Sequence, residues 1–202
     1  IDTSGPDIAG VNINDIERVE ITKGTGSVIY GDSAMAGAIH FYTKKSLESK
    51  VSLNSGNYGV TQTSASVGMN NEKINLNISI DNSEHDGFHK AATGGVKDKG
   101  KQTKSNFGGT YTTDNGTEIS LDISKTNSDI RYPNYLSDAQ FETDPTGNGS
   151  GSRYTYRDAE TSSLNYKVKR KLGENLEFIT NRSQIDNESK NYYFWSGTTV
   201  DN

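Results

Sequence analysis

The chain has no cysteine among its 202 residues, which excludes a disulfide framework and any metal site built from thiolates. Only 30% of the residues are hydrophobic, and no run of about eighteen apolar residues occurs, which excludes a membrane-spanning helix. The net charge is -5, and because no basic stripe is present we predict no nucleic-acid partner. The sequence also lacks a serine–histidine–acid order, paired catalytic carboxylates and a phosphate-binding loop, so we predict that it is not an enzyme.

So few apolar residues fit either a disordered chain or a sheet with one apolar face and one wet face. The pattern of the residues favours the sheet. Residues 74–80 alternate strictly, with Ile or Leu at even positions and Asn or Ser at odd positions, which is the period of a β-strand. Glycine-containing polar clusters separate such segments in the way that turns separate strands.

About seven segments after residue 48 predict strands. They cover residues 51–53, 65–69, 74–80, 107–111, 119–123, 164–168 and 176–185, the last with weaker alternation. Tight turns are expected at residues 56–59, 70–73, 114–116 and 173–175, a looser segment at 85–104 and a long irregular loop at 128–158. Short turns would therefore gather at one end of the sheet and the longest connections at the other, which is how outer-membrane barrels are built.

Alternation alone fits a sandwich or barrel in water equally well. Two details favour a membrane barrel. The face opposite the apolar one consists of Asn, Ser, Lys and Asp, which suits a wet lumen. Tyrosines also fall near the expected strand ends, where an interfacial girdle would place them. Examples are Tyr58, Tyr111, Tyr154 and Tyr156.

A short charged strand, Ile16–Ile21, is followed by a glycine-containing turn and a second β-prone segment at residues 38–43. Charges of alternating sign on so short a strand predict pairing against a polar wall rather than burial in an apolar core. The glycines of the turn, Gly24 and Gly26, do not fit a nucleotide-binding motif, because Ile29 stands where a third glycine would be needed.

These residues resemble the end of the plug domain of TonB-dependent outer-membrane receptors, where the plug passes into the barrel. Lys23, Thr25 and His40 depart from the family pattern, in which Arg, Pro and Asn are common at these positions. The residues that carry the resemblance are Ile16–Ile21, Lys23, Gly24, Ser27, Tyr30, Gly31, Ala34, Gly37, Ile39, Thr43 and Lys44.

The resemblance implies an all-β fold, namely a partial transmembrane antiparallel β-barrel preceded by the end of a small mixed α/β plug domain. The barrel part would contain about seven strands of a larger barrel. We expect residues 1–45 to be the last part of the plug and residues 46–202 to begin the barrel. Both ends of the chain are expected to be cut from a longer precursor.

The resemblance also implies a function, which is energised uptake of a scarce nutrient across the outer membrane of a Gram-negative-type bacterium. Its partners would be TonB, the nutrient and outer-membrane lipid. The cargo would be cobalamin, an iron–siderophore or haem, and the layout of the first strands looks most like the cobalamin-receptor branch. The alternative is a non-transporting β protein, either a passive porin or a secreted adhesin-like β-sandwich.

Two groups of residues are candidate functional sites. The charged residues of the first strand, inside a wet lumen by resemblance, are expected to contact the barrel wall. They are Glu17, Arg18, Glu20 and Lys23. Aromatic residues near the outer loops are expected to contact the ligand, the alternative being that they brace loops or belong to the interfacial belt. They are Tyr132, Tyr135, Tyr192, Tyr193 and Trp195.

The segment from His85 to Asp98 also contains Asp86 and His89, which are residue types that can hold transition metals. It is similar in place and length to the calcium-binding loops of the cobalamin receptors. Calcium requires six to eight oxygen ligands at one point, whereas this loop has few carboxylates and several lysines. We therefore predict no metal site and no cofactor, with calcium the one ion that the resemblance suggests.

Overall fold

The structure is a computed structural model that describes residues 16–24, 37–44, 48–90, 97–133, 135–148, 155–195 and 198–201. These residues form a two-stranded sheet and an eight-stranded sheet. None of the helices in this part of the chain is long and apolar enough to cross a membrane.

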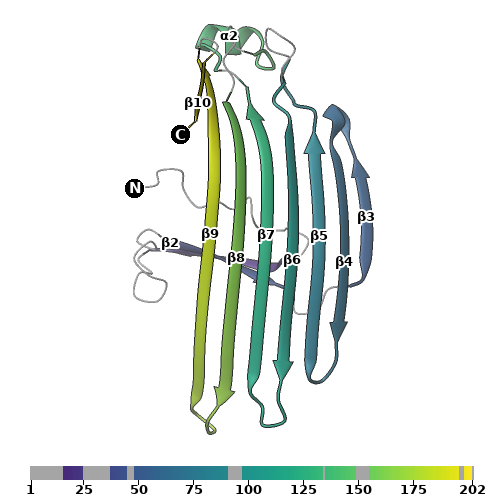
Figure 1. Ribbon diagram of the computed structural model, residues 1–202, viewed down its shortest axis with the longest axis vertical. Coiled ribbons are helices and arrows are strands. Elements are labelled where there is room, and N and C mark those ends of the chain that lie inside the picture. The colour runs from purple at the N-terminus through teal and green to yellow at the C-terminus, as the bar shows by residue number, and fades with distance from the viewer. Residues whose placement is uncertain are drawn as a thin grey trace.

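The large sheet is an antiparallel meander in which every strand pairs with its neighbours in the sequence, in the order β10-β9-β8-β7-β6-β5-β4-β3. Figure 1 shows the strands running side by side along the longest axis, with α2 at one end. The strands are β3 (Lys50–Ser55), β4 (Thr61–Asn70), β5 (Ile74–His85), β6 (Gly100–Thr112), β7 (Glu118–Tyr132), β8 (Thr155–Lys171), β9 (Glu177–Trp195) and β10 (Thr198–Asp201). The seven predicted strands are confirmed as β3 to β9, and β10 is an addition.

Several strands are longer than predicted. The looser segment expected at 85–104 starts where β5 ends, at His85, but its expected end is wrong, because β6 already begins at Gly100. The irregular loop expected at 128–158 is likewise too long, since β7 ends at Tyr132 and β8 begins at Thr155. Toward these ends polar side chains occur on both faces of the sheet, so hydrophobic alternation gives no signal although the backbone ladder continues.

The loop after β7 also contains α2 (Asp138–Thr143), which was not predicted. Ser137 caps this helix: its hydroxyl accepts a hydrogen bond from the backbone N–H of Gln140, and the side-chain oxygen of Gln140 accepts one from the backbone N–H of Ser137. This reciprocal arrangement is a capping box, and it satisfies two backbone donors that a helix end leaves free.

The two faces of the large sheet differ in chemistry. On the apolar face, successive strands bring Val67, Ile78, Phe107, Ile123 and Leu164 into one row, and Met69, Leu76, Gly109, Leu121 and Tyr166 into the next. On the polar face, the neighbouring rows are Ser66, Ser79, Asn106, Ser124 and Ser163, and Gly68, Asn77, Gly108, Asp122 and Asn165. This separation confirms the predicted period of two.

The apolar face is bare. Ile78 is 54% exposed and Val67 60%, and among the described residues Ala159 is the one buried hydrophobic residue. Burial of apolar area is the main favourable term in the folding of a water-soluble domain. The described part of the chain therefore lacks the hydrophobic core that such a domain needs.

The apolar rows stop at β9. There Gln184 pairs with Leu164, Arg182 with Tyr166 and Thr180 with Val168. The weaker alternation predicted for this segment therefore reflects a change from apolar to polar side chains on this face of the sheet at β9.

The small sheet is a hairpin of β1 (Ile16–Lys23) and β2 (Gly37–Thr43), paired antiparallel with an irregularity between Ile16 and Arg18. It confirms both strands expected here.

Candidate functional site

The connections divide the large sheet into two ends. At the turn end, short turns join β4 to β5, β6 to β7 and β8 to β9, whereas the loop end carries the longer connections 86–99 and 133–154 with α2. The first connection at the loop end is short, with the 3-10 turn η3 (Asn57–Gly59). The predicted distribution of short and long connections is confirmed.

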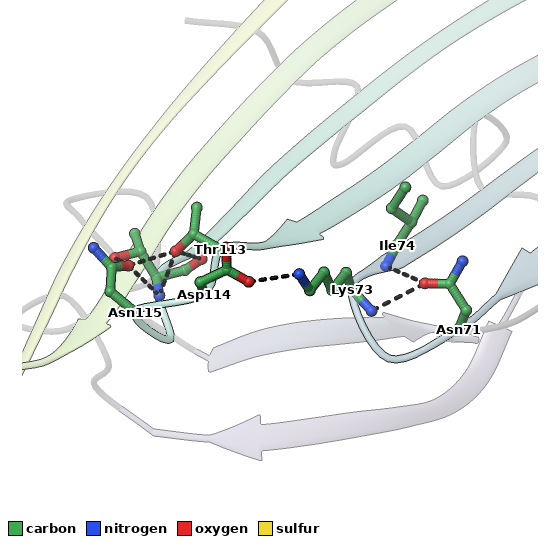
Figure 2. Close-up of polar contacts among 7 residues, drawn as sticks. Asn71, Lys73, Ile74, Thr113, Asp114 and Asn115 are labelled. Atoms are coloured by element: carbon green, nitrogen blue, oxygen red, sulfur yellow. Dashed lines mark hydrogen bonds and ion pairs between the residues drawn. The ribbon is translucent and has the colours of Figure 1, made fainter.

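The turn end is held by contacts that have a structural role (Figure 2). The Lys73 ammonium pairs with the Asp114 carboxylate at 2.5 Å and so joins two neighbouring turns. Within one of those turns, the Asn71 side chain accepts hydrogen bonds from the backbone N–H groups of Lys73 and Ile74, at 2.9 and 2.8 Å. These exposed side chains provide partners for polar groups of the turns themselves, and nothing about them indicates a binding site.

At the loop end, Asp98 organises the connection after β5. Its carboxylate is 6% exposed and accepts hydrogen bonds from His89 Nδ1 at 2.7 Å and from the backbone N–H groups of His89 and Phe88, at 3.0 and 3.2 Å. Burial alone would raise the pKa of Asp98, but these hydrogen bonds outweigh it and hold the pKa below its usual value. Gly87, with φ of +101°, fits against Asp98, and a Cβ there would lie 2.6 Å from the carboxylate.

The Asp98 carboxylate is therefore already hydrogen-bonded within its own loop. Among the described residues no group of three or more His, Cys, Asp or Glu side chains could hold a metal ion. The calcium-binding role that the resemblance suggested has no support from Asp98, whose oxygens already accept three hydrogen bonds.

Three rings, two from connections and one from the end of β5, meet beside this loop. The Tyr58 and Phe88 ring centroids lie 5.3 Å apart, and those of Phe88 and His85 lie 4.9 Å apart. The backbone N–H of Asp86 donates to the Tyr58 carbonyl at 2.8 Å and ties the two connections together. We call Tyr58, Phe88 and His85 the ring cluster. The sequence predicts turns and loops at these residues but has no pattern that shows them meeting, because the contact depends on the pairing of β4 with β5.

The two long connections are joined through Lys90. Its backbone N–H donates to the Thr146 carbonyl at 2.8 Å, and its ammonium pairs with Asp144 at 2.5 Å. The Asn148 side chain donates to the Lys90 carbonyl at 3.3 Å. The hydrogen bond from Lys90 lowers the pKa of Asp144. The loop end is thus a connected layer rather than a set of independent loops.

The predicted ligand contacts are only partly visible. Tyr132 ends β7 and is 41% exposed, and Tyr135 is fully exposed in the following connection. Both lie at the loop end, but no described contact brings them together. Tyr192, Tyr193 and Trp195 belong to the backbone of β9, and their side chains lie outside the described part of the structure. Their role in ligand binding stays a prediction.

Two of the charged residues of β1, Arg18 and Glu20, contact their own hairpin. Arg18 Nε lies 2.8 Å from Glu20 Oε1, the Tyr42 hydroxyl donates to Glu20 Oε2 at 2.9 Å, and the Arg18 guanidinium lies 3.9 Å from the Tyr42 ring centroid. The hydrogen bonds from Arg18 and Tyr42 lower the pKa of Glu20. A contact of Glu17, Arg18, Glu20 and Lys23 with the large sheet stays a prediction.

Comparison with known proteins bears on both parts of the chain. Residues 1–38 match the family model of the TonB-dependent Receptor Plug Domain. The boundary that we expect near residue 45 lies beyond the end of this match and stays a prediction. Among curated proteins, none matches the chain significantly.

Two solved structures resemble the chain in fold. The siderophore receptor PiuA from Acinetobacter baumannii matches with a TM-score of 0.67 and 13% identity, over 89% of this chain and 27% of that one. The copper transporter OprC matches with a TM-score of 0.51 and 14% identity, over 93% of this chain and 37% of that one. The chain thus spans less than half the length of either structure. Together with the plug match, the likeness confirms the predicted fold class: all-β, part of a larger antiparallel barrel preceded by the end of a plug domain.

Proposed function

We propose that the chain is part of a TonB-dependent outer-membrane receptor that takes up a scarce nutrient. The observation that carries this proposal is the continuity of two features in one chain. A plug-domain match at residues 1–38 is followed directly by a meander with one apolar and one polar face. A passive porin would not need a plug of this family, and an adhesin in water would not need a bare apolar face on successive strands.

In this proposal the apolar face contacts outer-membrane lipid, as the outward face of a membrane barrel does. The polar face lines a wet lumen that holds the plug. Short turns face the periplasm, and the layer of loops around Lys90 faces the cell exterior, where it meets the cargo. Glu17, Arg18, Glu20 and Lys23 form the polar contact between plug and wall, which yields when TonB acts.

The cargo belongs to the chelated metals or to haem or cobalamin. The two structural neighbours are described as a siderophore receptor and a copper transporter, which supports a metal chelate. The case for cobalamin as the cargo depends on the layout of the first strands alone. Calcium binding by the loop 86–99 would have supported it, but Asp98 already accepts hydrogen bonds within that loop.

Uptake measurements test the proposal. The complete gene product is expressed in an outer-membrane bacterium that lacks its own receptors, and uptake of candidate nutrients is measured with and without a functional TonB. We expect binding in both strains and uptake only where TonB works. Uptake that does not depend on TonB would identify a porin, and neither binding nor uptake would favour an adhesin. As a further arm, Arg18→Gln is expected to alter uptake and also plug accessibility, which is measured with a thiol probe at a cysteine introduced into β1 because the chain has none; no change in either would contradict the plug–wall contact.

A further inference from the structure

The ring cluster exposes apolar surface at the loop end. Tyr58 is 59% exposed and Phe88 is 49% exposed, although the two rings and that of His85 follow one another at stacking distances. Aromatic rings at such separations attract one another, yet this contact leaves half of each of the first two rings open. A stacked series of rings with free faces is able to receive a further planar ring.

The backbone beneath the cluster is strained. Tyr58 has φ 62° and ψ 28°, a left-handed conformation that is rare for a bulky side chain. It is held there by the hydrogen bond from Asp86 N–H to its carbonyl and by Gly59, where a Cβ would collide with the Asp86 carboxylate. Strain of this kind gathers at binding sites, where the surroundings fix it. Burial of the Tyr58 ring does not offset the cost of this backbone conformation, since the ring is mostly exposed.

The cluster has a polar end. His85 Nδ1 is buried and has no hydrogen-bond partner within the described part of the chain. The ring lies over Gly100, where a Cβ would be 2.6 Å from His85 Nε2. Glycine at this position therefore leaves space that the imidazole occupies.

A second buried nitrogen of the same kind lies in the same row. Register joins His85 to Gly100, Gly100 to Ile130 and Ile130 to Arg157, all on the polar face. Arg157 Nε is also buried without a partner among the described residues. Buried nitrogens of this type normally have partners, so the row holds two donors that the described residues leave without an acceptor, on the face that would line the lumen.

We propose that the ring cluster and Arg157 form a subsite for an anionic aryl chelate, one that carries catecholate or phenolate rings. One aryl ring stacks on Phe88 and Tyr58, its oxygen accepts a hydrogen bond from His85, and a second anionic oxygen of the ligand reaches Arg157. Three strand spacings separate β5 from β8, about 14 Å, so a single small aryl acid cannot reach both ends and a chelate with more than one arm can. This inference rests on the proposed function and names the class of its cargo.

The chemistry of the site argues against other ligands. A bare divalent cation finds no cluster of ligands among the described residues and is repelled by the Arg157 guanidinium. An aliphatic iron(III) trihydroxamate is neutral overall, because its three singly charged hydroxamates balance the metal ion, and it has no ring to stack on the cluster. The combination of free ring faces with a guanidinium and an imidazole fits a flat anion.

The test compares two probes on the complete gene product purified in detergent, an iron(III) tris-catecholate and an iron(III) trihydroxamate, by quenching of intrinsic fluorescence. Phe88→Leu keeps apolar bulk but removes the ring, and Phe141→Leu is its matched control, because Phe141 is an exposed aromatic residue of α2 at the same end (60% exposed). We expect Phe88→Leu to weaken catecholate binding at least tenfold and Phe141→Leu to leave it unchanged.

Tyr58→Gly separates a binding role from a packing role. Glycine adopts the left-handed conformation without strain, so this variant is expected to unfold at a higher temperature while binding the catecholate at least tenfold more weakly. Wild-type affinity in both Phe88→Leu and Tyr58→Gly would overturn the inference, as would a wild-type protein that binds only the hydroxamate. TonB-dependent uptake of the hydroxamate in that last case would leave the proposed function standing, whereas loss of all TonB-dependent uptake would overturn the function itself.

Discussion

At the scale of single residues, Asp98 is the group on which the order of the first long connection depends. Its carboxylate accepts three hydrogen bonds within the loop while almost fully buried. Asp98→Asn keeps the shape but removes the charge, and hydrogen bonds to a charged acceptor contribute roughly 2 kcal/mol. We expect faster hydrogen exchange at the amides of Phe88 and His89, measured by mass spectrometry, with no change at the amides of the distant turn around Asp114.

The same residue makes the loop sensitive to acid. The folded pKa of Asp98 lies below its usual value, so its stabilisation is complete above the pKa of the unfolded carboxyl, about 3.9. It is lost as the pH falls through the lower folded pKa. Protection of the loop amides, taken as their exchange relative to that of an unfolded peptide at the same pH, should therefore stay constant above this pKa and fall only in stronger acid; a fall already at pH 6 would assign the effect to another group.

At the scale of one strand, β8 offers adjacent residues on opposite faces. Leu164 belongs to the apolar face, and Asn165 to the polar face, where it pairs in register with Asp122. An arginine on the lipid side near the bilayer centre costs about 2–4 kcal/mol, whereas an arginine at position 165 faces water and a carboxylate. We expect Leu164→Arg to lower unfolding stability in lipid vesicles, measured by denaturant titration, by that amount and Asn165→Arg to change it little. Equal effects of the two variants would show that the faces are assigned wrongly.

At the scale of the whole molecule, the exposed apolar face determines whether the fold is stable in water or needs an apolar environment. The described residues bury one hydrophobic side chain, Ala159, and the sheet keeps open edges at β3 and β10, which invite association. We expect the chain to be an aggregate in plain buffer and to give a strand-rich circular dichroism spectrum as a dispersed particle in detergent. A folded monomer in plain buffer, measured by sedimentation, would contradict this expectation.

Sequence reasoning succeeded where apolar residues alternate and failed where both faces are polar. Residues 74–80 and 119–123 were predicted because one face is apolar, but the strand ends from Gly100 and up to Tyr132 have no such contrast. The Ser137 and Gln140 capping pair was readable in principle, yet it starts a helix of only 6 residues. The ring cluster had no sequence signal, because the connections that carry Tyr58 and Phe88 are brought together by the pairing of β4 with β5 and by the hydrogen bond from Asp86 to the Tyr58 carbonyl.

The meander also determines how many strands such a sheet can gain or lose at a time during evolution. Because each strand pairs only with its sequence neighbours, a whole hairpin can be duplicated or deleted and the remaining strands keep their partners and their faces. A single-residue insertion within a strand instead turns every following side chain of that strand to the opposite face. A wall of this kind therefore varies in steps of two strands, which agrees with the even strand numbers of bacterial outer-membrane barrels.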